Sequence, residues 1–315
     1  MKPVVPFISH DGENERGAWQ TALPKALGAI ADVKPFKDLT EAERSNAKVA
    51  IVANPDPAEV AALPNLAWVQ SLWAGVERLA ADLPEDGPLI VRLTDPQMAE
   101  TMSEAVLAWT LYLHRDMPRY GLQQRRKIWQ EHLLKTPQER TVGVLGIGKL
   151  GSASVRRLKA NNFNVLGWSR SRKVLDGIQC RHGQEGMTAV LQQSDILVIL
   201  TPLTAETRGL LGQAELNSCK PGAALINFAR GPIVDTIALL DALDNGPLSH
   251  AVLDVFDEEP LPHSSPLWEH EKVTVLPHIS APTITSTATE IVVQNIGGYF
   301  ETGTIPQSVD RKRGY

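Results

Sequence analysis

The chain has 315 residues, of which 43% are hydrophobic and 21% are charged, and its formal net charge at pH 7 is −5. This length is enough for two domains with separate cores, and the composition is that of an ordinary globular protein. The negative charge argues against nucleic acid as the main partner. The two cysteines, Cys180 and Cys219, are too few for a disulfide framework and lack metal-ligand spacing, so we expect no metal site.

The N-terminal apolar run at residues 4–8 is short and broken by proline, so it does not predict a signal peptide. No later stretch approaches the roughly 20 apolar residues that span a bilayer. We therefore expect a soluble cytoplasmic protein with no membrane partner.

Two short apolar runs in the first third, at residues 48–53 and 66–72, are typical of buried strands. Trp73, Ala74 and Gly75 follow the second run as a loop. Helical patterns separate such strands, and this alternation predicts a parallel, doubly wound sheet.

Residues 98–126 carry apolar side chains at helical spacing, after an Asp95-Pro96 pair that is a plausible helix start. The spacing predicts one long helix. It is either a core helix or a contact between subunits, and the sequence leaves both open.

A second α/β series begins near residue 141. Strands are predicted at 141–145, 164–168, 195–200, 223–227, 250–254 and 273–276, with a helix around 289–296. Six strands are the number in a complete dinucleotide-binding sheet.

A Gly-x-Gly-x-x-Gly loop joins the first of these strands to a helix predicted at 152–160. Gly146 permits the tight turn, Gly148 lets the backbone approach a pyrophosphate, and Gly151 allows close packing of helix on strand. The amides of Lys149 and Leu150, at the positive end of the helix, are predicted to bind the phosphates. This context makes packing alone a poor explanation for the glycines.

The end of the next strand bears on the choice of coenzyme. An NAD enzyme would place Asp or Glu here to bind the ribose 2′-hydroxyl. This chain instead has Ser169, Arg170, Arg172 and Lys173. Because basic side chains attract a 2′-phosphate, we predict NADPH as the preferred coenzyme, with NADH possible but weaker. The alternative interpretation is a solvated basic loop.

Three chemical groups follow downstream: Arg230 between a strand and Gly231, Glu259 before Pro260, and His278 after Pro277. A guanidinium can hold a substrate carboxylate with two hydrogen bonds. An imidazole can protonate a ketone oxygen near neutral pH, and a carboxylate can orient and charge that imidazole. These are the groups needed to reduce a 2-keto acid.

With the glycine loop, the blocks at residues 227–235, 254–261 and 277–278 resemble the D-isomer-specific 2-hydroxyacid dehydrogenase family over essentially the whole chain. Residues 168–173, 265–268 and 309–315 are similar to its bacterial glyoxylate/hydroxypyruvate reductase A branch. The resemblance implies two α/β domains with doubly wound parallel sheets. A Rossmann-type coenzyme domain would comprise residues 98–284. A flavodoxin-like substrate domain would comprise 1–97 and 285–315, with the active site in the cleft between the two.

The resemblance also implies further site residues. Asp254 would bind the nicotinamide carboxamide, and Ala229 would lie near the same ring. Thr201, Pro202 and Thr207 would form a wall beside the adenosine. The amides of Ala74 and Gly75 would hold the substrate carboxylate, and Trp73 would either line the substrate pocket or pack in the core. A homodimer is implied as well.

The function predicted on this basis is NADPH-dependent reduction of glyoxylate to glycolate and of hydroxypyruvate to D-glycerate. Two alternatives stay open: a reductase for bulkier 2-keto acids such as phenylpyruvate, and a dinucleotide-sensing binding protein. The sequence does not give the pocket size that decides the substrate. The basic run at residues 311–313 is interpreted as a solvated end or a subunit contact.

Overall fold

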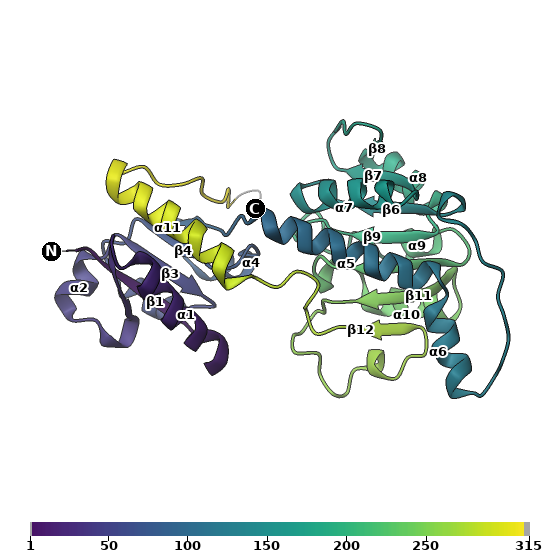
Figure 1. The fold of residues 1–315 in the computed structure, drawn as a ribbon, viewed down its shortest axis with the longest axis horizontal. Coiled ribbons are helices and arrows are strands. Elements are labelled where there is room, and N and C mark those ends of the chain that lie inside the picture. Colours follow the sequence, from purple (N-terminus) through teal and green to yellow (C-terminus); the bar gives the residue numbers. More distant parts are fainter. Residues whose placement is uncertain (1, 312–315) are drawn as a thin grey trace. The chain divides into compact units, whose positions relative to one another are not determined.

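The computed structural model describes residues 2–311 and divides into two compact units. One contains the residues up to Gln97 together with those from Thr283 onward, and the other runs from Met98 to Pro282 (Figure 1). The chain therefore leaves the first unit once and returns to it. The return falls at residues 282/283, where the sequence-based boundary is 284/285.

The N-terminal unit is built on a five-stranded sheet in which every pairing is parallel. Its strand order is β2 (Asp32–Pro35), β1 (Val4–Ser9), β3 (Val49–Ala53), β4 (Trp68–Ser71) and β5 (Leu89–Val91). The two strands expected from the sequence are β3 and β4.

Helices cover both faces of this sheet (Figure 1). One face packs against α1 (Glu13–Leu27) and α11 (Thr285–Thr302), and the other against α3 (Pro57–Ala61) and α4 (Glu77–Asp82). Leu39 and Ala47, which flank α2 (Glu41–Asn46), join the core on this second face. Successive side chains of a strand point to opposite faces. Ile51 accordingly joins the core under α1 and α11, and Val52 joins the core on the other face. Burial on both sides explains why β3 is apolar throughout.

The second unit contains a seven-stranded parallel sheet. Its order is β12 (Val273–Val275), β11 (Leu248–Leu253), β10 (Ala223–Asn227), β9 (Ile196–Ile199), β6 (Thr141–Leu145), β7 (Asn164–Ser169) and β8 (Gln179–His182). The prediction of six strands was wrong by one, because β8 is largely exposed and polar and carries no apolar pattern.

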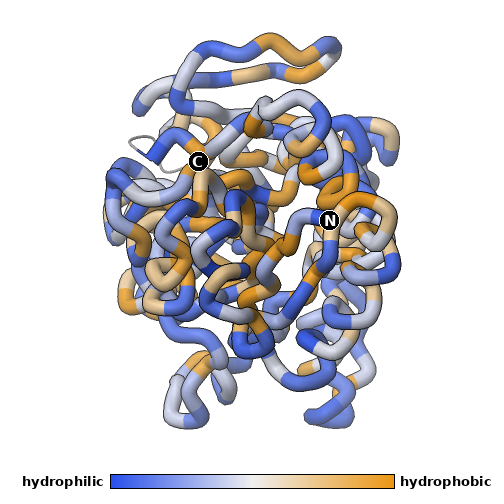
Figure 2. The backbone as a smooth tube through the Cα atoms, turned by 90° about the vertical axis from the view of Figure 1, so that its left-hand side faces the viewer, coloured by the Kyte–Doolittle hydropathy of each residue, from blue (hydrophilic) through white to orange (hydrophobic). Residues whose placement is uncertain are grey.

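The seven-stranded sheet is also covered on both faces. α5 (Pro96–His114) and α7 (Lys149–Ala160) pack on one face, and α8 (Gly183–Gln193), α9 (Gln213–Asn217) and α10 (Thr236–Asp244) pack on the other. Short 3₁₀ turns occur at Phe36–Asp38, Pro137–Glu139, Gly231–Ile233 and Pro266–Trp268. Along the backbone in Figure 2, hydrophobic stretches alternate with hydrophilic ones.

The single helix predicted at residues 98–126 was wrong. α5 ends at His114, and α6 (Met117–Arg125) begins after Asp116, whose φ of 53° lies in the left-handed region. A left-handed residue cannot continue a right-handed helix, so the chain bends there. The start of α5 agrees with the sequence, because Asp95 Oδ1 accepts a hydrogen bond from the amide of Gln97 at 2.8 Å.

The C-terminal basic run also differs from expectation at its first residue. The Arg311 guanidinium donates to the carbonyl oxygens of Leu83 at 3.0 Å and Pro88 at 2.9 Å, so it is bound to the N-terminal unit and is not a solvated end. Residues 312 and 313 lie outside the described residues. Across residues 2–311, no helix combines the length and apolar composition needed to cross a membrane.

Candidate active site

The strand order reverses at β6, which lies between β7 and β9. The chain winds from β6 through β7 to β8 on one side, and then from β9 to β12 on the other. In open parallel sheets, ligands bind beyond the carboxyl ends of the strands at such a switch point. The loops that follow β6, β7 and β9 are therefore the first place to look for a nucleotide site.

The loop after β6 is the glycine loop. Gly146 has a φ of 102°, and a Cβ there would lie 2.6 Å from the backbone of Leu200 and Thr201, so only glycine fits. α7 starts at Lys149, three residues earlier than predicted, with Gly148 as its N-cap. The space over the Cα of Gly148 is open among the described residues. The first amides of α7 therefore face a place that an anion can occupy.

The loop after β7 carries the predicted 2′-phosphate residues. Ser169 is buried, and its hydroxyl donates to the carbonyl of Ser171 at 2.7 Å. Arg170 forms an ion pair with Glu206, a residue of the loop after β9. Lys173 Nζ donates to the carbonyl oxygen of Ile147 at 2.6 Å. Lys173 thus ties this loop to the glycine loop, a contact that its position in the sequence did not predict, while Arg172 is exposed.

The loop after β9 contains Thr201, which is 4% exposed and whose Oγ1 has no hydrogen-bond partner within residues 2–311. A buried hydroxyl without a partner at this position could form a hydrogen bond with a bound ligand. The hydroxyl of Thr207 donates to the carbonyl of Pro202 at 2.6 Å and accepts from the amide of Thr204 at 2.8 Å. Thr207 therefore holds the shape of the loop.

Asn227, the last residue of β10, sets the conformation of the segment that carries Arg230. Its Oδ1 accepts from the amide of Ala229 and its Nδ2 donates to the carbonyl of Arg230, both at 3.1 Å. Arg230 Nη1 donates to the carbonyl of Ala229 at 2.7 Å. Gly231 comes next, and a Cβ there would overlap the main chain of Phe256. The missing side chain lets the arginine segment pack directly on the segment that leads to Glu259.

Glu259 and His278 form the central contact of the site. His278 Nδ1 lies 2.7 Å from Glu259 Oε2, and Glu259 Oε1 accepts from the amide of Phe256 at 2.9 Å. An ionised carboxylate only accepts hydrogen bonds, so the Nδ1 proton belongs to the histidine. The other ring nitrogen, Nε2, is then the one that can exchange a proton with a substrate.

The electrostatic environment favours the charged form of this pair. The hydrogen bond to Glu259 raises the pKa of His278 above its ordinary value, although burial opposes this and the nearby Arg230 charge lowers it. Burial alone would raise the pKa of Glu259, but hydrogen bonds from His278 and the Phe256 amide bring that pKa below its usual range. Arg230 also acts on Glu259 electrostatically, so the three predicted groups share one environment.

Asp254 fixes the backbone around His278. It is 2% exposed, and its two carboxylate oxygens accept from the amides of Ile279 at 2.7 Å and Ser280 at 2.9 Å. His278 has a φ of 54°, which costs energy for a residue with a Cβ. The two bonds from Asp254 help to hold that conformation. This positioning role is additional to the predicted contact with a nicotinamide.

The predicted substrate residues Trp73, Ala74 and Gly75 lie in the N-terminal unit, after β4. The Trp73 amide donates to Ser71 Oγ at 3.0 Å, and its ring packs edge-on against Trp19 with centroids 6.5 Å apart. Trp73 and Gly75 also line a small cavity of about 40 Å³ in this unit. Trp73 therefore both packs against Trp19 and lines this small cavity.

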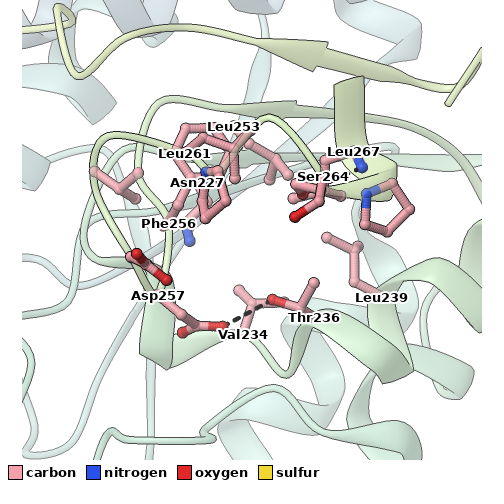
Figure 3. Close-up of a pocket in the computed structure, with 16 residues that line it drawn as sticks. Asn227, Val234, Thr236, Leu239, Leu253, Phe256, Asp257, Leu261, Ser264 and Leu267 are labelled. Carbon is pink, nitrogen blue, oxygen red and sulfur yellow. Dashed lines mark hydrogen bonds between the residues drawn. The ribbon is translucent and has the colours of Figure 1, made fainter. Parts of the chain in front are cut away.

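A larger cavity, of about 310 Å³, lies in the second unit beside the segments that carry Arg230 and Glu259 (Figure 3). Its walls are mainly aliphatic, and Thr236 donates to Asp257 Oδ2 at 3.0 Å across one side (Figure 3). None of the sixteen described residues that line it is basic. A 2-keto acid needs a cation for its carboxylate, so we do not assign this cavity to the substrate.

Asn227 and Glu206 are among the contributions that sequence reasoning missed. Asn227 was noted only as part of a strand and motif, although a polar residue at the carboxyl end of an apolar strand is a sign of a loop-fixing role. The pairing of Glu206 with Arg170 had no sequence sign at all, because the two residues lie in loops far apart along the chain.

Residues 107–280 match the D-isomer specific 2-hydroxyacid dehydrogenase family in its NAD binding domain. This match includes the glycine loop, Arg230, Glu259 and His278.

Two solved structures are similar over their full length. A D-isomer specific 2-hydroxyacid dehydrogenase from Xanthobacter autotrophicus Py2, solved with NADPH and MES, is 38% identical, covers 100% of both chains and has a TM-score of 0.91. An NADPH-dependent glyoxylate/hydroxypyruvate reductase from Sinorhizobium meliloti, solved with NADP and sulfate, is 30% identical with the same coverage and a TM-score of 0.89.

Proposed function

Because the chain belongs to the D-isomer specific 2-hydroxyacid dehydrogenases, we propose that it reduces small 2-keto acids with NADPH. The reactions proposed are glyoxylate to glycolate and hydroxypyruvate to D-glycerate. The observation that carries this proposal is the 2.7 Å hydrogen bond between His278 and Glu259, in the same unit as the glycine loop and the basic residues after β7. The two units would then be the coenzyme domain and the substrate domain.

The residues present fit an NADP coenzyme. The open space over Gly148 and the N-terminus of α7 suit a pyrophosphate, with the amides of Lys149 and Leu150 as donors. The unsatisfied hydroxyl of Thr201 lies on the predicted adenosine side. Ser169 and Arg170 would take the 2′-phosphate. The Sinorhizobium meliloti reductase, similar over its whole length, was solved with NADP, which supports this choice.

The nicotinamide end has its own candidate donors and acceptors. Asp254 already accepts two backbone amides, and each carboxylate oxygen has a further lone pair for a carboxamide. Ser280 Oγ is buried beside it and has no hydrogen-bond partner in the described part of the chain. Ala229, which is also buried, would lie against the ring.

Three charged groups of this chain would take part in the reaction. Arg230 would hold the substrate carboxylate through two hydrogen bonds and polarise the adjacent keto oxygen. The bound coenzyme would supply hydride to the keto carbon. His278 Nε2 would donate its proton to the oxygen of the same carbonyl group as charge develops there, and Glu259 would stabilise the imidazolium before this step. The product is a 2-hydroxy acid, and His278 is reprotonated from solvent.

In the N-terminal unit, we propose that the amides of Ala74 and Gly75 donate to the substrate carboxylate and that Trp73 limits the size of the substrate. The cavity that Trp73 and Gly75 line in that unit supports this assignment. A Trp73→Ala variant should accept phenylpyruvate better relative to glyoxylate.

We further propose that the protein is a homodimer in the cytoplasm. The segment between α6 and the turn at Pro137–Glu139 exposes Ile128, Trp129, Leu133 and Leu134, and Trp129 is 98% exposed. A cluster of large apolar side chains in water supports a protein contact there. Sedimentation equilibrium of the protein and of a Leu133→Glu variant would test the dimer.

The proposed cytoplasmic location agrees with the free thiols of Cys180 and Cys219, which suit a reducing compartment.

The test of the function is a panel of 2-keto acids, from glyoxylate and hydroxypyruvate to phenylpyruvate, assayed with NADPH and with NADH. We expect the highest kcat/KM for the small acids with NADPH. His278→Ala should lower kcat by roughly 10²- to 10⁴-fold while NADPH still binds. Highest activity with phenylpyruvate would indicate a reductase for bulky acids. NADPH binding without turnover of any acid would indicate a dinucleotide sensor.

A further inference from the structure

Arg170, the proposed ligand of the 2′-phosphate, already has an anionic partner in this structure. Its guanidinium Nη1 pairs with the Oε2 of Glu206, and the two side chains are 60% and 63% exposed. Arg170 follows β7 and Glu206 lies in the loop after β9, so the pair joins segments on the two sides of β6.

The backbone that carries Glu206 is held in place. Thr207 binds the carbonyl of Pro202 and the amide of Thr204, which closes the loop around the glutamate. Lys173 is engaged with the carbonyl of Ile147 at 2.6 Å. Two cations of the basic loop therefore make different contacts: Lys173 donates a hydrogen bond to the glycine loop, and Arg170 forms an ion pair with Glu206.

A phosphate group in this position would carry a charge of about −1.5 to −2 at neutral pH. It has the same sign as the Glu206 carboxylate and would need the same guanidinium. The 2′-phosphate of NADPH would therefore compete with Glu206 for the positive charge of Arg170, whereas NADH has only a neutral hydroxyl at the ribose 2′-position.

We propose that Glu206 is a specificity-determining residue, a counter-ion that competes with the coenzyme 2′-phosphate for Arg170 and so limits the preference for NADPH. This inference rests on the proposed use of NADPH. Glu206 does not contact the reacting atoms; it acts on the relative affinity for the two coenzymes through Arg170.

Exposed ion pairs are weak, and this sets the size of the effect. Removing the carboxylate should tighten the binding of a 2′-phosphate by roughly twofold to fivefold, the range expected for breaking one exposed pair. Binding of a coenzyme without the 2′-phosphate should stay unchanged.

The experiment compares the unmodified protein with Glu206→Gln by calorimetric titration. The probes are adenosine 2′,5′-bisphosphate and adenosine 5′-monophosphate, followed by NADPH and NADH. The expected result is a bisphosphate-to-monophosphate affinity ratio that rises twofold to fivefold in the variant. An unchanged ratio or a lower ratio overturns the proposal, because a lower ratio would mean that Glu206 orients Arg170 for the phosphate.

A matched control is available in the same unit. Arg126 and Glu271 form an ion pair at 2.8 Å with side chains 54% and 57% exposed, and Glu271 precedes β12, at the amino ends of the strands. Glu271→Gln breaks a similar pair and should leave the ratio unchanged. In an Arg170→Ala background, Glu206→Gln should change the ratio less than in the unmodified protein. An equal change there would overturn the counter-ion role.

The test separates the failure of this inference from failure of the proposed coenzyme. If the unmodified protein binds the bisphosphate no better than the monophosphate, the NADPH assignment fails and the role of Glu206 fails with it. If the unmodified protein prefers the bisphosphate and Glu206→Gln does not change that preference, only the role of Glu206 fails.

Discussion

Replacing Glu259 with glutamine tests the proposed proton donor without removing it. The amide keeps the shape of the carboxylate, and its oxygen can still accept from His278 Nδ1, which now lies 2.7 Å from Glu259 Oε2. Its NH₂ group then faces the amide of Phe256, which loses its acceptor. The variant loses the negative charge, which stabilises an imidazolium. Because the hydrogen bond to Glu259 is the main reason that the pKa of His278 is raised, the variant should have a lower His278 pKa.

The size of the loss follows from the exchange of one hydrogen bond for another. A bond to a charged group contributes about 1.5 to 3 kcal/mol, and a neutral bond contributes about 0.5 to 1.5 kcal/mol. Both side chains are partly exposed, so we take a difference of about 1 kcal/mol, which corresponds to a roughly fivefold lower kcat at neutral pH. This is much smaller than the loss expected when the imidazole itself is removed.

The assay is the pH profile of kcat for glyoxylate reduction. Reduction needs protonated His278, so kcat falls as pH rises through the His278 pKa, and the variant should lose activity at a lower pH. At acidic pH, where the imidazole is protonated in both proteins, the difference should shrink. Glu258→Gln, which removes a neighbouring charge, is the control. A uniform loss at every pH, with the alkaline limb unmoved, would refute the assigned role of Glu259.

Three further predictions concern the coenzyme loop, the packing of the site and a buried histidine. Arg170→Ala should raise the KM for NADPH much more than the KM for NADH in initial-rate assays, and equal changes would contradict the 2′-phosphate assignment. Gly231→Ala should force the arginine segment away from Phe256, which should lower the free energy of unfolding by about 1 to 3 kcal/mol and raise the KM for the keto acid. Denaturant titration measures the first effect and initial-rate kinetics the second. A stable, fully active variant would show that the contact is not needed. Burial, with a smaller effect from His270, lowers the pKa of His250 to about 4, so the unfolded chain binds the proton first as the pH falls below 6.5. The free energy of unfolding should therefore decrease by about 2 to 3 kcal/mol between pH 6.5 and pH 4.5. In denaturant titrations, the His250→Asn variant should show a smaller decrease over the same pH range.

The fold was largely predictable because its strands are buried on both faces. β3 and β9 are continuous apolar runs, and such runs stand out in a sequence. β8 was missed since it is held by backbone pairing with β7 at the edge of the sheet and its side chains face water. The break between α5 and α6 was missed because apolar residues recur on both sides of Asp116, although Pro118 in the first turn of α6 is a sequence sign of a new helix.

The candidate site residues could be proposed from the sequence where one side chain has distinctive chemistry, and less so where a contact between segments matters. Arg230, Glu259 and His278 are each chemically distinctive in their local sequence. The amide contacts of Asp254, by contrast, depend on how the ends of β11 and β12 lie side by side. The contact of Lys173 with Ile147 depends in the same way on the packing of two loops. The chemistry of a side chain can be read from its own position in the sequence, whereas contacts between loops depend on the three-dimensional fold.

The return of the chain to its first unit has a consequence for the order of events during synthesis. Ala288, Val292 and Ile296 of α11 belong to the core that also contains Trp19 and Leu23 of α1. The ribosome must therefore make all of residues 98–282 before it delivers the helix that completes that core, a delay of roughly 10 to 40 seconds. During this time the first 97 residues leave apolar surface uncovered, and we expect nascent chains arrested before residue 283 to bind chaperones through that surface.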